Sequence, residues 1–301
     1  MRYNKPSLTI EQQADLLLSR GLTGDRDLMI TRLASVSYYR LSGYWFSFLR
    51  PDNSFQNDTK FEDIWQRYVF DRRLRLLIMD SVERIEVAVR SQLALHHSQL
   101  HGPFAYATKL SSMPSLSADQ HKSFLENITV EASRSKEFFV KHFQAKYGDC
   151  HDNLPVWMSS EIMSFGCTLT FFKGSDPNVR KRVARLFAIQ DVVLESWLLT
   201  LNTIRNICAH HGRLWNRLLR LKPKIPNKDH IWHRPVAISG ERVFGILTIC
   251  KHCLNRIAPQ SQWPQRLHGL LSGSPNIPIT EMGFPANWDN SPIWKPPAPQ
   301  S

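Results

Sequence analysis

The sequence has few of the features that several common classes of protein require. Its 301 residues include only five cysteines, an odd number, so we expect reduced thiols and no disulfide framework. No segment approaches the roughly 20 consecutive apolar residues of a membrane-spanning helix. Residues 1–12 are polar and lack the apolar centre of a signal peptide. We therefore expect a cytoplasmic protein without a membrane partner.

The motifs of several enzyme classes are also missing. The chain contains neither a glycine-rich phosphate loop nor a Gly-x-Ser-x-Gly elbow. Cys250 and Cys253 have the spacing of zinc ligands, and His230 and His233 upstream could complete such a site. The two cysteines also continue an apolar helical stripe, however. We interpret them as core residues and expect no metal and no cofactor.

Acidic residues are scarce relative to basic ones. Lys and Arg total 38 and Asp and Glu total 26, which gives a formal charge of +12 and a pI near 9.7. Such a balance favours polyanionic partners, because basic side chains that neutralise phosphates release counterions. Nucleic acid is the partner that we expect, and a charge that serves only solubility is the alternative.

What the chain does contain is helical periodicity, with no strand-rich region and no internal repeat. We predict an all-α bundle whose helices lie at residues 9–20, 25–37, 61–97, 119–147, 156–172, 177–187, 191–221 and 240–257. An interruption of the helix at 156–172 is expected near Gly166. After Pro259 the density of prolines predicts an extended tail that wraps the body or is partly loose.

We divide the chain into three parts on this basis. Residues 1–60 form an N-terminal helical extension, residues 61–221 the helical core, and residues 222–301 a C-terminal helix with the proline-rich tail.

Residues 197–219 carry the most informative pattern. On a helical wheel one stripe is apolar and should face the core: Trp197, Leu201, Ile204, Cys208, His211, Trp215 and Leu218. The opposite stripe is polar: Asn202, Asn206, His210, Arg213 and Arg217. Arg205 lies on the flank, about 140° from His210. His211 is therefore expected to be buried and hydrogen-bonded.

The polar stripe suits phosphodiester chemistry. Histidine exchanges protons near neutral pH, and arginine binds phosphate oxygens and stabilises growing negative charge. RNA supplies its own nucleophile, the 2′-hydroxyl, so no metal is required. The spacing Arg-x4-6-His is loose, and Arg90 with His96 or His97 fits it equally well. On spacing alone, a solvated polar helix face is the favoured interpretation.

The residues around this spacing resemble a known family. The segment from Arg205 to Arg217, RNICAHHGRLWNR, is similar to the signature of AbiD/AbiF-like abortive infection proteins. Further blocks occur in the expected order: KPSLT from Lys5, RGL from Arg20, YYRLSGY from Tyr38, FDR from Phe70, ERIEVAVRS from Glu83, and PVW from Pro155 with Glu161 and SFG from Ser164. The resemblance spans residues 5–217 and weakens after about residue 224.

The resemblance implies a branch of the HEPN superfamily of helical ribonucleases. Their products carry a 2′,3′-cyclic phosphate and a 5′-hydroxyl, and two motifs meet at one composite site. His210 would be the general acid or base, Arg205 the phosphate clamp, and Asn206 an orienting residue. Because this chain has one full motif, a homodimer is expected.

Several other residues are candidates for supporting roles. Glu86 and Arg90 lie on one face of a long helix with Glu83, and they either orient Arg205 or form an ordinary intrahelical pair, which we favour. A basic run beside the site could guide the RNA backbone or be a solvated surface: Arg213, Arg217, Arg220, Lys222 and Lys224. Four aromatic residues could stack on bases, although core packing is favoured: Tyr38, Tyr39, Tyr44 and Trp45.

The sequence thus predicts a metal-independent endoribonuclease toxin of bacterial antiphage defence, with RNA as substrate and a regulatory RNA or antitoxin as a further partner. Two alternatives stay open. The chain could be a non-catalytic RNA-binding regulator or an oligomeric interaction module. A HEPN scaffold with a different modification chemistry is a third.

Overall fold

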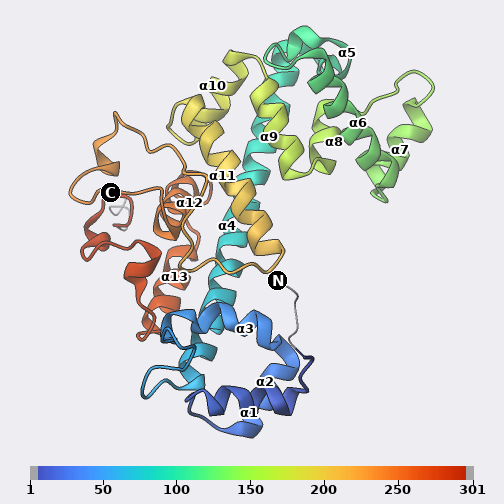
Figure 1. Ribbon diagram of the computed structural model, residues 1–301. Coiled ribbons are helices and arrows are strands. Elements are labelled where there is room, and N and C mark those ends of the chain that lie inside the picture. The colour runs from blue at the N-terminus through green and yellow to red at the C-terminus, as the bar shows by residue number, and fades with distance from the viewer. Residues whose placement is uncertain (1–5, 296–301) are drawn as a thin grey trace.

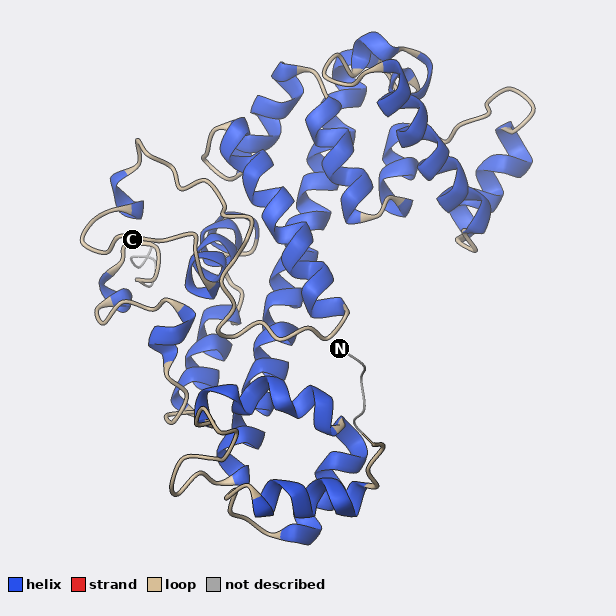
Figure 2. Cartoon of the chain, viewed as in Figure 1, coloured by secondary structure: helices blue, strands red, loops and turns tan. Residues whose placement is uncertain are grey.

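The computed structural model describes residues 6–295, which form thirteen α-helices and no β-strand. The expected all-α class is confirmed. Figures 1 and 2 show an elongated assembly of helices around one long central helix. No helix of the described chain is both long and apolar enough to cross a membrane. The predicted three-part division of the chain stays a prediction, and residues 1–5, which include Lys5, lie outside the described range.

The N-terminal helices form a ring at one end of the molecule (Figure 1). They are α1 (Ile10–Ser19), α2 (Arg26–Val36) and α3 (Tyr38–Trp45). The predicted capping box of α1 is present, because the Thr9 and Gln12 side chains each accept a hydrogen bond from the other residue's backbone amide. The aromatic segment at 38–45, to which the sequence assigned no structure, is helical.

Helix α4 (Phe61–His101) has 41 residues and runs through the whole molecule. Apolar residues recur at helical spacing along this segment, which predicts one uninterrupted helix. That prediction is confirmed. Helices α3, α8, α9, α10, α11, α12 and α13 all contact α4. It is therefore the common support for both halves of the chain.

The next elements surround the C-terminal end of α4. They are α5 (Ala105–Thr108), α6 (Ala118–Arg134), α7 (Phe138–Tyr147), α8 (Val156–Ile162), α9 (Phe165–Gly174) and α10 (Pro177–Leu186). The single helix expected at 119–147 is two helices, separated at 135–137. The expected interruption within 156–172 is present, but it lies at Met163 and Ser164, where the Ser164 hydroxyl caps α9 by accepting from the Cys167 amide.

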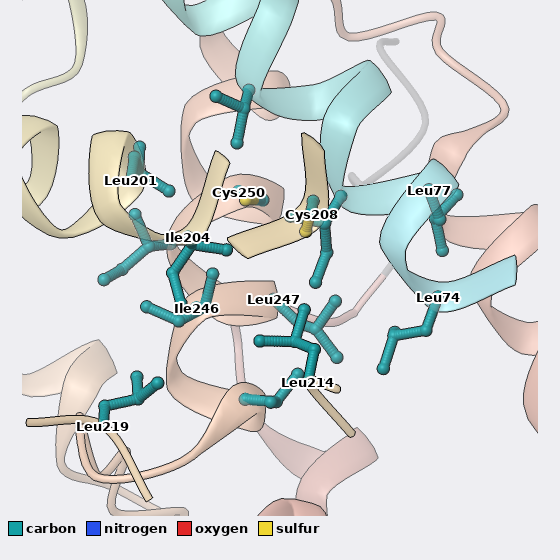
Figure 3. Close-up of a cluster of buried hydrophobic side chains, with 14 of the residues drawn as sticks. Leu74, Leu77, Leu201, Ile204, Cys208, Leu214, Leu219, Ile246, Leu247 and Cys250 are labelled. Atoms are coloured by element: carbon teal, nitrogen blue, oxygen red, sulfur yellow. The ribbon is translucent and has the colours of Figure 1, made fainter. Parts of the chain in front are cut away.

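The remaining helices are α11 (Asp191–Ala209), α12 (Val243–Ile257) and α13 (Trp263–Ser272). Figure 3 shows the apolar cluster that joins α4, α11 and α12. Its members include Leu74 and Leu77 from α4, Ile204 and Cys208 from α11, and Leu247 from α12, all of them buried. This packing fixes one side of α11 and leaves its other side for the candidate site.

The tail after residue 259 packs against the body, as one of the two predicted outcomes had it, but the prediction that it is extended was wrong for residues 263–272, which form α13. Helix α13 begins at Trp263 with Pro264 in its first turn, a position that tolerates proline because no amide donor is needed there. The Trp263 ring is fully buried, and its Nε1 donates to the Leu77 carbonyl of α4 at 2.8 Å. Trp294 stacks on Trp263, so the chain packs against the body up to this point. Pro296, Pro297 and Pro299 lie outside the described residues.

Candidate active site

The candidate catalytic residues lie together at the C-terminal end of α11. Arg205 and Asn206 belong to its last turns, and His210 is the residue that ends it. Asn206 and His210 are exposed, Arg205 is half-buried, and Arg205 Nη1 donates to Asn206 Oδ1 at 3.3 Å. Within residues 6–295 no hydrogen bond joins Arg205 to His210. A guanidinium, an amide and an imidazole are thus available to a ligand at one helix end.

The helix ends twelve residues earlier than the expected boundary at residue 221. The His211 amide donates to the Cys208 carbonyl at 3.0 Å, and the Gly212 amide donates to the Ile207 carbonyl at 2.8 Å. These two bonds form a Schellman motif, whose left-handed residue is His211 with φ of 57°. The wheel drawn for residues 197–219 therefore does not apply beyond Ala209.

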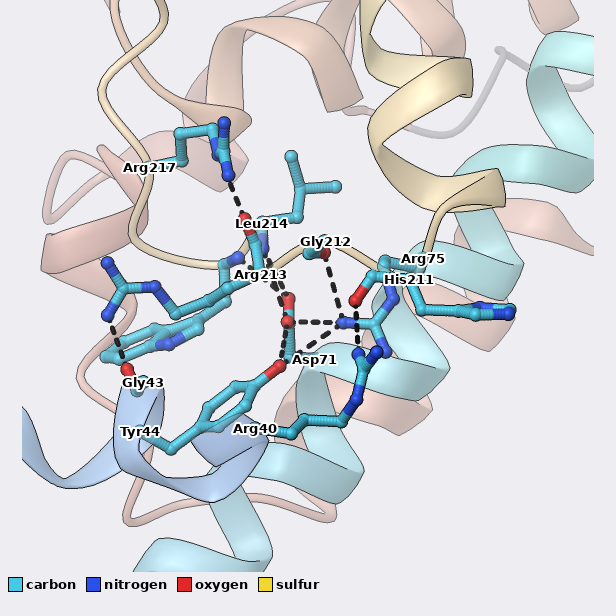
Figure 4. A network of polar contacts seen from close by, with 11 residues as sticks. Arg40, Gly43, Tyr44, Asp71, Arg75, His211, Gly212, Arg213, Leu214 and Arg217 are labelled. Atoms are coloured by element: carbon cyan, nitrogen blue, oxygen red, sulfur yellow. Dashed lines mark hydrogen bonds and ion pairs between the residues drawn. The ribbon is translucent and has the colours of Figure 1, made fainter. Parts of the chain in front are cut away.

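Two residues of the predicted core stripe are consequently exposed. His211, which we expected to be buried, lies at the turn with an exposed side chain that points away from the network in Figure 4. Leu218 is 62% exposed. Trp215 is buried as expected, but from a loop and not from a helix.

The loop after His210 is held by the buried carboxylate of Asp71 on α4 (Figure 4). Asp71 accepts hydrogen bonds from the amides of Leu214 at 3.2 Å and Trp215 at 2.8 Å. It also accepts from the Tyr44 hydroxyl at 2.7 Å and from Arg75 Nη1 at 2.5 Å. One side chain therefore joins α3, α4 and the segment that follows the candidate site.

Two guanidiniums, those of Arg40 and Arg75, hold the turn itself. Arg40 Nη1 donates to the His211 carbonyl at 2.7 Å, and Arg75 Nη1 approaches the Gly212 carbonyl at 3.4 Å. These bonds give hydrogen-bond partners to two carbonyl groups of the turn that follows α11. The position of His210 is thereby fixed by contacts from α3 and α4.

Burial dominates the electrostatics of this network. It raises the pKa of the Asp71 carboxyl, and Arg75, the Tyr44 hydroxyl and the two loop amides act in the opposite direction. Burial also raises the pKa of the Tyr44 hydroxyl, and the Asp71 carboxylate adds to that effect, so Tyr44 stays a donor. Removal of the Asp71 carboxylate would leave the Leu214 and Trp215 amides without the acceptor that they share.

The sequence interpretation missed this network. Asp71 and Arg75 interrupt an otherwise apolar stripe of α4, at positions that continue the spacing of Ile64, Tyr68 and Ile78. A charged pair in such a stripe is a signal that could have identified them, because buried charges require partners. The partners, however, come from residues 214 and 215, which are remote in the sequence.

Residues 31–216 match the model of the Abi-like protein family. This range covers more than half of the chain. The chain belongs to the Abi-like family. The matched range contains the candidate residues and Asp71, and it ends directly after the loop that Asp71 holds. No curated protein and no solved structure matches the chain. The resemblance to AbiD/AbiF-like abortive infection proteins is thus confirmed.

Glu86 and Arg90 of this Abi-like protein form the intrahelical ion pair that we favoured. Arg90 also donates to the Met163 carbonyl and, at 3.2 Å, to the Thr168 hydroxyl, so it joins α4 to the segment around the start of α9. Burial raises the pKa of Glu86, while Arg90 and Arg205 act in the opposite direction. Glu86 therefore lies within electrostatic reach of Arg205, with no hydrogen bond between them in the described chain.

The competing motif of Arg90 with His97 does not form an accessible site. His97 is fully buried and its ring lies 5.1 Å from that of Phe171. Arg90 is engaged by Glu86 and the α9 segment. Of the Arg-x4-6-His spacings that we considered, the one at Arg205 has the exposed histidine.

The predicted basic run is exposed throughout: Arg213, Arg217, Arg220, Lys222 and Lys224. Its members differ in their partners. Arg213 Nη1 donates to the Gly43 carbonyl at 2.5 Å, and Arg217 Nε donates to the Arg213 carbonyl at 2.9 Å. Lys222 is paired with Glu241 at 2.5 Å. Arg213 and Arg217 therefore lie next to the turn after His210, whereas the charge of Lys222 is partly neutralised.

The aromatic residues of α3 divide into two groups. Tyr44 and Trp45 are buried, as we favoured, and Tyr38 is half-buried against Trp45. Tyr39 is 89% exposed. Core packing thus accounts for Tyr44 and Trp45 but not for Tyr39.

Cys250 and Cys253 are fully buried in α12. Burial raises the pKa of the Cys250 thiol to about 12, so it stays protonated. The His233 ring lies 3.0 Å from the Pro226 carbonyl. The two cysteines occupy core positions, as we interpreted them from the sequence.

Proposed function

We propose that this Abi-like protein is an endoribonuclease of the HEPN type that acts in abortive infection, and that its reaction needs no metal ion. The observation that carries the proposal is the end of α11, where Arg205, Asn206 and His210 share one helix end that a buried network holds in place. These three residue types together provide proton transfer and phosphate binding.

The proposed reaction is an internal transfer within RNA. The 2′-hydroxyl loses its proton to a histidine and attacks the adjacent phosphorus, while the bond from phosphorus to the 5′-oxygen breaks. The leaving 5′-oxygen takes up a proton, and the products are a 2′,3′-cyclic phosphate and a 5′-hydroxyl. Arg205 would stabilise the charge that grows on the phosphate oxygens, and Asn206 would orient Arg205 through their hydrogen bond.

We further propose that two copies of the chain build one site. Arg205 and His210 of one chain share no hydrogen bond in the described residues. In a homodimer the second motif supplies the missing partner, so that Arg205 of one copy acts with His210 of the other.

The biological role follows from this chemistry. Cleavage of host or phage RNA would stop growth before a phage spreads. A toxin of this kind requires control, and we expect a regulatory RNA or an antitoxin protein to bind it.

The proposal is tested with purified wild type and two variants, Arg205→Ala and His210→Ala, incubated with RNA in excess EDTA. We expect the wild type to cleave and each variant to lose at least about a hundredfold in rate, since general acid–base catalysis by His210 and charge stabilisation by Arg205 each contribute about that much. His142→Ala removes an exposed histidine of α7 and serves as the matched control. The ends of the products are identified by their reactivity toward kinase and ligase.

Equal rates for the wild type and both variants would overturn the proposal. If RNA is bound but never cut, the chain is an RNA-binding regulator. If RNA is neither bound nor cut, the helix end serves assembly with another protein.

A further inference from the structure

We propose that Tyr39 and Phe46 form a stacking platform for unpaired bases of RNA, with the Arg213 guanidinium between them. We call Tyr39, Gly43 and Phe46 the aromatic face of α3. The inference rests on the proposed function, because it assigns that enzyme a single-stranded substrate and a place for the bases next to the scissile phosphate.

The exposure of the two rings is the first observation. Tyr39 is 89% exposed and Phe46 is 75% exposed, whereas Tyr44 and Trp45 between them are buried. Helix α3 therefore already has an inner face that its other aromatics occupy. Large aromatic side chains usually bury their area, so two bare rings on the outer face indicate a surface that binds something.

The second observation is their common direction. Positions 39, 43 and 46 lie within about 60° of one another on a helix. Phe46 directly follows α3 and begins the 3-10 turn Phe46–Phe48, so the chain continues in a right-handed helical sense through Trp45, whose φ is −101° and ψ is −3°. Gly43 has no side chain and leaves a gap between the two rings, along about 10 Å of helix.

Arg213 lies against Gly43. Its Nη1 donates to the Gly43 carbonyl at 2.5 Å, and its Cδ lies 3.9 Å from the point where a Cβ on Gly43 would be. The guanidinium is thus bound at the position of the chain that lies between the two aromatic residues. Planar guanidinium groups and aromatic rings both stack on bases, and the guanidinium also binds phosphate oxygens.

The third observation is continuity with the candidate site. Arg213 follows His210 by three residues, and Arg40, the neighbour of Tyr39, donates to the His211 carbonyl. Figure 4 shows Arg40, Gly43 and Arg213 around the same turn. The aromatic face is therefore held in a defined position relative to His210.

Charge and shape favour single-stranded RNA as the occupant. The cations Arg40, Arg213 and Arg217 lie along the turn, and the whole chain carries a formal charge of +12. A duplex hides the faces of its bases, whereas an unpaired strand presents both bases for stacking and phosphates for the guanidiniums.

The test measures RNA affinity in a His210→Ala background, which prevents cleavage during the experiment. Fluorescence anisotropy gives Kd for a labelled unpaired oligoribonucleotide and for the same oligomer paired with its complement. We expect Tyr39→Ala, Tyr39→Leu and Phe46→Ala each to weaken binding of the unpaired RNA by about tenfold. Tyr39→Trp should keep the affinity, because it keeps a ring.

Phe138→Ala is the matched control, because Phe138 is 80% exposed on α7, at the far end of the molecule in Figure 1. Phe138→Ala should leave the Kd for unpaired RNA unchanged. All of the variants should leave the Kd for paired RNA unchanged. Circular dichroism checks that each variant is folded. We expect all of them to fold, because the replaced side chains are exposed.

Three results would overturn the stacking platform. The first is an unchanged Kd for unpaired RNA in both alanine variants. The second is equal weakening by Tyr39→Leu and Tyr39→Trp. The third is a change of oligomeric state in light scattering with RNA affinity intact, which would identify a protein interface. The proposed function is tested by a different measurement. If it is wrong, the wild type does not cleave RNA, whatever the Kd values of the Tyr39 and Phe46 variants are.

Discussion

Two buried polar side chains of α4 have opposite surroundings. Asp71 accepts hydrogen bonds from two backbone amides, a tyrosine hydroxyl and a guanidinium. His97 is also fully buried, but neither of its ring nitrogens has a hydrogen-bond partner in the described chain. A buried group without partners favours the neutral form, which makes His97 a source of pH dependence.

We predict that His97 makes the protein less stable in mild acid. Burial, together with the neighbouring His101, lowers the pKa of His97 from 6.5 to about 4, against a smaller opposing effect of Asp176. The unfolded chain therefore binds a proton that the folded protein excludes. The stability that His97 contributes is complete above about pH 6.5 and is lost as the pH falls toward 4.

Urea unfolding at pH 7 and pH 5 measures this effect. The free energy of unfolding should fall between pH 7 and pH 5, and this fall should be about 2 kcal/mol smaller in His97→Leu than in the wild type. His142→Leu replaces an exposed histidine and should retain the wild-type loss. An unchanged pH dependence in His97→Leu would mean that His97 is charged or hydrogen-bonded in the folded protein.

The single residues of the candidate site could be identified in the sequence, because Arg205, Asn206 and His210 form a local motif. Asp71 could not be assigned its role in the same way. Its two amide donors belong to residues 214 and 215, about 140 positions further along the chain. A side chain's partners depend on which segments meet, and that is a property of the packed structure.

At the scale of elements, the end of α11 is the point at which helical periodicity misled us. Apolar residues continue at helical spacing from Trp197 to Leu218. The helix nevertheless ends at Ala209, because Asp71 binds the amides of Leu214 and Trp215 that a longer helix would use internally. Tertiary hydrogen bonds thus outweigh local propensity at this turn.

We predict that His211→Gly stabilises the protein. A left-handed conformation at φ of 57° costs a residue with a side chain about 1 kcal/mol, and glycine adopts it freely. Thermal unfolding should therefore occur about 2 °C higher. His210→Gly, at the adjacent position with φ of −87°, should give no such increase. A lower melting temperature for His211→Gly would show that the imidazole makes a stabilising contact.

Helix α13 shows a second limit of the sequence pattern. Prolines at 259, 264, 275 and 278 indicated an extended tail. Pro264 instead occupies the first turn of a helix, and Trp263 fills a buried site against α4. Proline breaks a helix when it lies in the interior and is tolerated in the first turn. Whether a segment with prolines is helical therefore depends on where the helix begins, which the burial of Trp263 decides here.

At the scale of the whole molecule, α4 carries elements from both ends of the chain to one place. Its N-terminal part holds α3 and the turn after His210, and its C-terminal part packs on α8, α9 and α10. The candidate site and the aromatic face of α3 consequently belong to segments about 170 residues apart that one helix brings together.

We predict that two inactive variants restore activity when they are combined. If Arg205 of one copy acts with His210 of a second copy, a mixed dimer of Arg205→Ala and His210→Ala keeps one of the two Arg205–His210 pairs of the composite site. Co-expression should give about a quarter of the wild-type cleavage rate, because about half of the dimers are mixed and each keeps one pair of two.

Each variant alone should form dimers in light scattering and remain inactive. A mixture that forms mixed dimers without any cleavage would show that Arg205 and His210 must belong to the same chain. A monomeric wild type that cleaves RNA would exclude the composite site altogether.

The sequence by itself determined the all-α class, most of the helices before residue 210, the family and the local motif of Arg205, Asn206 and His210. These depend on spacing within short segments, which is fixed by the period of the helix. Tertiary structure decided where α11 ends, that His211 is exposed, that α13 packs on α4, and that Arg213 lies beside Gly43 of α3. Each of these depends on partners far apart in the sequence, because a buried carboxylate or tryptophan is satisfied only by the segments that the fold brings to it.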